Sequence, residues 1–158
     1  MNKKVEFALS ILFFWVKGSV AVDSRFVKVN TANAILGIFP AGRDAETMPL
    51  KNISSTKLSS KYKIFPMIIG ILIILIALSR LGTSFFGALI FFIIGALIFG
   101  SGMLTTLIIQ RAGNDYAISV PFFEKNKLLI AQNSIEEALA HDTDKTDLNQ
   151  FFDKKGTN

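Results

Sequence analysis

Two long apolar runs constrain the fold of this chain more than any other feature. Residues 65–79 read FPMIIGILIILIALS and residues 85–109 read FFGALIFFIIGALIFGSGMLTTLII, and neither run contains an ionisable side chain. A helix that crosses a bilayer needs about 20 apolar residues. The second run reaches this length, and the first does so over residues 62–81 if Lys63 and Arg80 extend their charged ends to the interface. Only the short segment RLGTS separates them, so the sequence predicts a transmembrane helical hairpin.

The composition narrows the possible functions. A pair of buried helices in a soluble fold is the alternative to the hairpin, and the absence of a polar stripe along either run disfavours it. The chain has 158 residues, is 51% hydrophobic and lacks Cys, which excludes disulfides and thiolate metal sites. A single His, His141, excludes a multi-histidine metal site. With no catalytic triad, phosphate loop or basic–aromatic patch recognisable, we expect no enzyme, cofactor, metal or nucleic-acid partner.

Basic residues near the apolar runs predict the orientation of the hairpin. Lys57, Lys61 and Lys63 precede the first run, Arg111 follows the second, and Arg80 lies in the turn. Lys and Arg accumulate on the cytoplasmic side of membrane proteins. We therefore expect a multi-pass protein of the cytoplasmic membrane, with both termini in the cytoplasm and these five side chains at the membrane interface.

Small residues at matching positions predict how the two helices pack. Gly70 and Ala77 are seven residues apart in the first run, and Ala88 and Gly95 are seven apart in the second. In an antiparallel hairpin, Ala77 faces Ala88 and Gly70 faces Gly95, because each pair is equidistant from the turn. Small residues let apolar helices approach closely, so we expect both contacts.

The segments on either side of the hairpin read mostly as strands. Short runs rich in β-branched and aromatic residues, separated by turn residues, predict a β-meander. The predicted elements are strands at 19–23, 25–30, 34–39, 46–53 and 115–123, and an amphipathic helix at 128–141. Residues 5–16 fit a strand, an interfacial helix or a signal-like segment, and the residues alone leave these alternatives open.

The two flanking parts are each too small to enclose a core. Because both lie on the same side of the predicted hairpin, we expect residues 1–61 and 112–141 to form one cytoplasmic domain. The hairpin, residues 62–111 with helices at 62–81 and 85–109, would interrupt this domain, and residues 142–158 would form a polar tail.

Three segments carry a resemblance to a known family. They are KGSVAVDSRFVKVN, MPLKNISS, and YAISVPFF followed by the helix that ends in IEEALAHD. The chain resembles bacterial small membrane proteins with a pleckstrin-homology-like domain split by a transmembrane hairpin, a family of unknown function. The resemblance implies an α+β membrane protein with a small, bent antiparallel sheet and a C-terminal helix, and it carries no catalytic residues.

Together these features predict a non-catalytic, membrane-anchored adaptor or accessory subunit of a membrane complex. Its expected partners are the lipid bilayer and either a membrane protein or a second copy of the chain. One alternative is a sensor of anionic lipid headgroups that uses the basic residues of the strand region and the lysines before the first run, namely Lys17, Arg25, Lys28, Lys57, Lys61 and Lys63. Another is a small immunity or inhibitor protein that acts on a membrane target.

Overall fold

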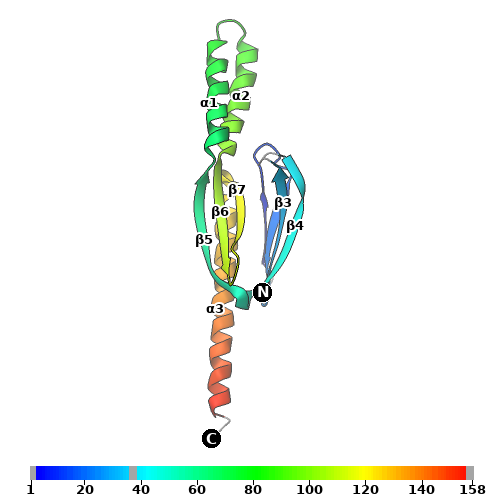
Figure 1. Ribbon diagram of the computed structural model, residues 1–158, viewed down its shortest axis with the longest axis vertical. Coiled ribbons are helices and arrows are strands. Elements are labelled where there is room, and N and C mark those ends of the chain that lie inside the picture. The colour runs from blue at the N-terminus through cyan, green and yellow to red at the C-terminus, as the bar shows by residue number, and fades with distance from the viewer. Residues whose placement is uncertain (1–2, 36–38, 156–158) are drawn as a thin grey trace.

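The computed structural model describes residues 3–35 and 39–155, which form an α+β fold with two antiparallel sheets and three α-helices (Figure 1). The first sheet has the order β1-β2-β3-β4, with strands β1 (Lys3–Ala8), β2 (Lys17–Val22), β3 (Phe26–Ile35) and β4 (Phe39–Pro49). The second has the order β5-β6-β7, with strands β5 (Ile53–Tyr62), β6 (Met103–Arg111) and β7 (Tyr116–Pro121). The helices are α1 (Ile64–Ser79), α2 (Phe85–Ser101) and α3 (Lys125–Lys155), with short 3-10 turns η1 (Leu50–Asn52) and η2 (Phe122–Glu124).

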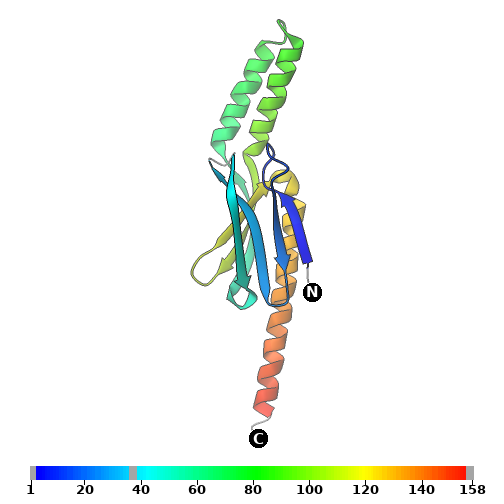
Figure 2. The ribbon, with the colours of Figure 1, turned by 90° about the vertical axis from the view of Figure 1, so that its right-hand side faces the viewer.

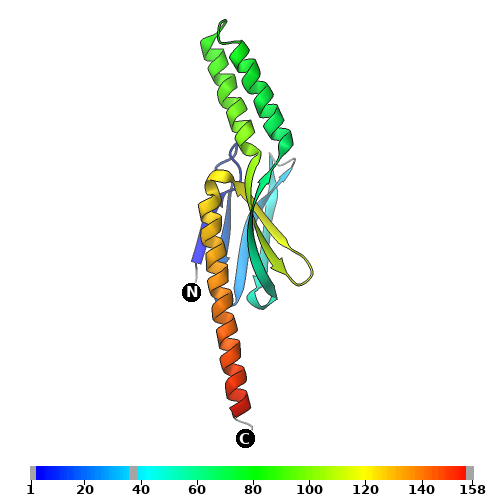
Figure 3. The ribbon, with the colours of Figure 1, turned by 90° about the vertical axis from the view of Figure 1, so that its left-hand side faces the viewer.

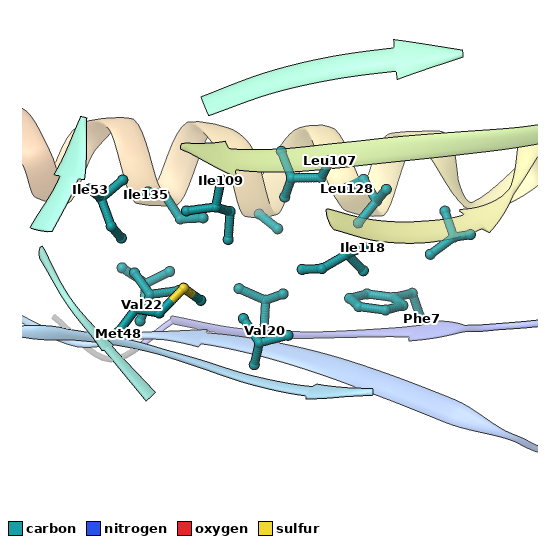
Figure 4. Close-up of a cluster of buried hydrophobic side chains, with 14 of the residues drawn as sticks. Phe7, Val20, Val22, Met48, Ile53, Leu107, Ile109, Ile118, Leu128 and Ile135 are labelled. Atoms are coloured by element: carbon teal, nitrogen blue, oxygen red, sulfur yellow. The ribbon is translucent and has the colours of Figure 1, made fainter. Parts of the chain in front are cut away.

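Alternation along the strands explains why the two sheets face each other. In β3, Val27 and Val29 are buried whereas Phe26, Lys28 and Asn30 are exposed. Successive side chains of a strand point to opposite faces, so this pattern gives the sheet one apolar face and one polar face. The apolar faces of both sheets meet in a common core (Figure 4).

Helix α3 completes the core. Its first half packs against β1, β2, β5 and β6, and it buries Leu128, Ala131 and Ile135 completely. The Glu124 carboxylate, just before α3, accepts a hydrogen bond from the Ala8 backbone N–H at 3.2 Å and pairs with Lys127. This contact holds the start of the helix at the end of β1. The rest of α3 projects beyond the sheets, away from α1 and α2 (Figure 3).

Helices α1 and α2 form a hairpin inserted between two neighbouring strands. Strand β5 leads into α1 through Lys63, and α2 leads into β6 through Gly102. Tyr62 pairs with Met103, and the Lys63 N–H donates to the Gly102 carbonyl at 2.8 Å. The β5–β6 ladder therefore continues to the base of the hairpin, which projects from one end of the two-sheet domain (Figure 2).

The prediction of a transmembrane hairpin is wrong, because both helices are shorter than the spans predicted at residues 62–81 and 85–109. Helix α1 has 16 residues and α2 has 17. Across the described ranges of the chain, no helix combines the length and the apolar character needed to cross a membrane. The multi-pass localisation and the orientation of the termini, which rested on that hairpin, are overturned with it.

Strand β6 explains the error at the end of the second run. Residues 103–109, which were assigned to the second helix, lie in β6 and pair with β5, and residues 104–109 also pair with β7. Their sequence, MLTTLII, is rich in β-branched residues that suit a strand. At the other end, Tyr62 is the last residue of β5 rather than the first of a helix.

The expected single bent sheet is also wrong. Besides β6, two strands were not predicted: β1 overlaps the ambiguous residues 5–16, and β5 runs through residues 54–61, for which the sequence predicted no element. Strands β2 and β3 overlap the two strands predicted at 19–23 and 25–30, each missing one predicted residue at the turn between them. The strand predicted at 34–39 falls partly on residues 36–38, which lie outside the described part. Helix α3 is much longer than the predicted 128–141 and takes up most of the predicted polar tail.

Candidate functional site

The surface of the hairpin is apolar on every side. Large hydrophobic side chains are exposed along both helices, and Phe65 and Phe86 are 77% and 78% exposed. In α2 the exposed positions include six consecutive residues, 89–94. Because successive residues of a helix are about 100° apart, six in a row cover its whole circumference. The hairpin therefore lacks the polar face that a helix in contact with water normally has.

Four small residues hold the two helices together. Gly70, Ala77, Ala88 and Gly95 are the buried residues of α1 and α2. A Cβ atom on Gly95 would lie 3.0 Å from the Gly70 carbonyl oxygen, and one on Gly70 would lie 2.5 Å from the backbone nitrogen of Phe99. The structure thus brings Gly70 and Gly95 together, and it places Ala77 and Ala88 side by side near the tip.

The five basic residues assigned to the interface do not lie together. Lys61 and Lys63 lie at the base of the hairpin, and Arg80 ends α1 at its tip. Lys57 is six residues before Lys63 along β5, about 20 Å away in an extended strand. Arg111 ends β6 at the opposite end of the domain, where it pairs with Glu46.

The other basic residues of the headgroup-sensor alternative, those of the strand region, are also dispersed. Lys17 begins β2 at the hairpin end of the domain, whereas Arg25 lies in the turn between β2 and β3 at the far end. Lys28 lies between them on the exposed face of β3. These three side chains do not converge on one site.

A cavity of about 280 Å³ opens between the two sheets, on the hairpin side of the domain. Its polar groups include Thr31, Asp44, Lys63 and Tyr116, and the loop between β1 and β2 forms one wall. The hydroxyl groups of Thr31 and Tyr116 are 3.1 Å apart and share a hydrogen bond. Sequence reasoning missed this cavity because its walls come from segments far apart in the chain, and no local pattern signals it.

Tyr116 is the titratable group of the cavity whose pKa is shifted. Burial raises the pKa of the Tyr116 phenol, and the nearby carboxylates Asp44 and Glu46 raise it further. The hydrogen bond with Thr31 and the charge of Arg111 act in the opposite direction. The phenol is therefore a neutral hydrogen-bonding group at physiological pH, which suits a structural role between the sheets.

The described residues offer no group of three or more acidic or histidine side chains that could hold a metal ion. Comparisons with known proteins also place no constraint on function. No family model, no curated protein and no solved structure matches the chain. The resemblance to membrane proteins with a split pleckstrin-homology-like domain is therefore wrong as an assignment of family.

We predict that Gly70→Ala destabilises the hairpin. The added Cβ would overlap the backbone of Phe99, and such overpacking costs about 1–3 kcal/mol. Thermal unfolding in mild detergent, followed by circular dichroism, should show a lower midpoint. Gly82→Ala at the tip is the matched control, because its Cβ would meet nothing within 4 Å. Equal effects of the two changes would contradict the packing described here.

We predict that Tyr116→Phe changes how stability depends on pH. Loss of the hydrogen bond with Thr31 should cost about 0.5–1.5 kcal/mol near pH 8. A phenol whose pKa is raised on folding contributes stability below its unfolded pKa of about 10, and this is lost as pH rises through the folded pKa. The gap between wild type and variant should therefore narrow above about pH 10.

Urea unfolding near pH 8 and above about pH 10 measures the difference in unfolding free energy between wild type and Tyr116→Phe. Tyr62→Phe is the matched control, because Tyr62 is the only other tyrosine and is largely exposed. A gap between wild type and Tyr116→Phe that stays constant with pH would contradict the assignment.

Proposed function

We propose that this protein is a non-catalytic accessory or adaptor protein that binds a lipid bilayer by embedding its helical hairpin in the lipid. The observation that supports this most directly is the hairpin surface, which is apolar around the full circumference of α2. Contact of that surface with water is unfavourable by roughly 25 cal/mol for each Å². A contiguous apolar surface that extends along two helices marks a binding surface.

Lipid suits this surface better than a second copy of the chain does. A second hairpin would cover one face of α1 and α2 and leave the opposite faces in water, because neither helix has a polar face to turn outward. Acyl chains can surround the hairpin completely. The residues 64–79 and 85–101 also contain no ionisable side chain whose burial in hydrocarbon would be costly. Arg80, in the turn at the tip, is the charge that enters the lipid with the hairpin, and a long Arg side chain can extend its charged end to an interface.

An edge strand supports the adaptor part of the proposal. Among the described residues, strand β4 lies at the edge of its sheet and pairs only with β3. An unpaired strand edge can receive an extended segment from a partner protein. The domain would thus hold such a partner close to the lipid surface while the hairpin provides attachment.

Flotation with phosphatidylcholine vesicles tests the attachment. We expect the wild-type protein to float with the vesicles and a variant with Leu72→Asp and Ile90→Asp to stay at the bottom of the gradient. Both side chains are more than half exposed, so the change leaves the helix contacts intact. Each charge in the hydrocarbon costs about 2.5–3.5 kcal/mol or more.

A double variant with Leu129→Asp and Ile130→Asp is the control. It introduces the same charges at exposed apolar positions on α3 and should float like the wild type. The proposal fails if the wild-type protein remains in buffer as a stable oligomer, or if the hairpin variant floats unchanged.

A further inference from the structure

Exposed aromatic residues surround the base of the hairpin. We call them the aromatic collar: Phe14, Trp15, Tyr62, Phe122 and Phe123, which are 50–66% exposed. They come from three separate parts of the chain, namely the loop between β1 and β2, the end of β5, and η2. Figures 2 and 3 show this loop and the start of α3 beside the base of α2.

Contacts at Gly100 show that the collar segments lie against α2. A Cβ atom on Gly100 would be 3.3 Å from Cδ1 of Ile11, in the β1–β2 loop, and 3.8 Å from Cε1 of Phe122. Tyr62 pairs with Met103 at the base of the hairpin, one residue before Lys63 and two before α1. The collar therefore follows the boundary between the apolar hairpin and the polar domain.

The rings of the collar are supported by one another. Trp15 makes edge-on contacts with Phe13 and Phe14, with ring centroids 5.3 Å and 5.2 Å apart. Phe122 and Phe123 make a similar contact at 5.7 Å. Such contacts are favourable beyond the area they bury, so the rings are presented to the outside as two preformed groups.

The charges beside the collar are mainly positive. The exposed lysines at this end of the domain include Lys61, Lys63, Lys125 and Lys127. The acidic residue closest in sequence to the last two, Glu124, is buried and already paired with Lys127. Trp and Tyr, represented in the collar by Trp15 and Tyr62, accumulate at headgroup level, and lysines there attract anionic lipid.

We infer that the aromatic collar and its lysines bind the headgroup layer of an anionic lipid bilayer. This rests on the proposed function, since the hairpin must first enter the lipid. It adds that the end face of the domain lies on the bilayer surface and gives the protein a preference for anionic headgroups. A protein groove would need matching acidic groups around an apolar slot, whereas an anionic bilayer offers both over its whole surface.

Trp15 is the only tryptophan in the chain, so its fluorescence reports on the collar without labelling. We expect its emission in phosphatidylcholine–phosphatidylglycerol vesicles to lie at shorter wavelength than that of hydrated tryptophan. Lipids brominated near the headgroup should quench it more than lipids brominated at the chain ends. The control carries Trp15→Phe and Phe26→Trp, which moves the probe to the far end of the domain, and should not be quenched.

Competition between neutral and anionic vesicles tests the role of the lysines. In a mixture of neutral and phosphatidylglycerol-containing vesicles, Lys61→Gln with Lys63→Gln should reduce the preference for anionic vesicles about tenfold to thirtyfold. Lys28→Gln with Lys51→Gln is the control, because these exposed lysines lie away from the hairpin, and it should keep the preference.

The outcomes separate the two proposals. Failure of the wild-type protein to float with any vesicle overturns the proposed function and the collar together. A wild-type protein that floats while Trp15 keeps the emission of hydrated tryptophan and escapes quenching overturns the collar alone. Equal losses of preference in both lysine variants would also overturn it, because the effect would then reflect net charge rather than position.

Discussion

The backbone ladder between β5 and β6 determines the shape of this molecule. Its pairing extends to Tyr62 and Met103 and ends in the hydrogen bond from Lys63 to Gly102. The helices α1 and α2 begin where this ladder ends, so the direction of the hairpin is set by the strands. A side chain at position 102 would overlap Met67 and the Lys63 carbonyl group, which explains why a glycine lies at this junction.

This junction gives the molecule two ends of different chemistry. The hairpin end combines the apolar helices with exposed aromatic rings and lysines, whereas the far end carries polar turns and the ion pair between Arg111 and Glu46. The core between the sheets closes independently of the hairpin, because Val20, Leu107 and Ile118 pack among themselves and with α3. The domain therefore buries its own apolar side chains without the hairpin, whose apolar surface is left exposed.

Local patterns in the sequence predicted some of these features and failed at others. Alternation at Val27 and Val29 predicted a strand. Symmetry about the turn predicted that Gly70 would face Gly95. The assignment of residues 103–109 to a helix failed because a short apolar run fits a buried strand as well as a helix. Only pairing with β5 and β7 decides between them, and that pairing is not local. For the same reason, neither the cavity around Tyr116 nor the collar could be read from the sequence.

The length of the hairpin connects the two proposals physically. A helix of 16 residues is about 24 Å long, whereas the hydrocarbon core of a bilayer is about 30 Å thick. Such a hairpin can bury all of its apolar surface only by entering the lipid as far as its base. Its base then lies at headgroup level, where Trp15 and Tyr62 meet an environment suited to rings with one polar edge. A longer hairpin would hold the domain away from the headgroups, so under both proposals the shortness of α1 and α2 is what would bring the collar to the lipid.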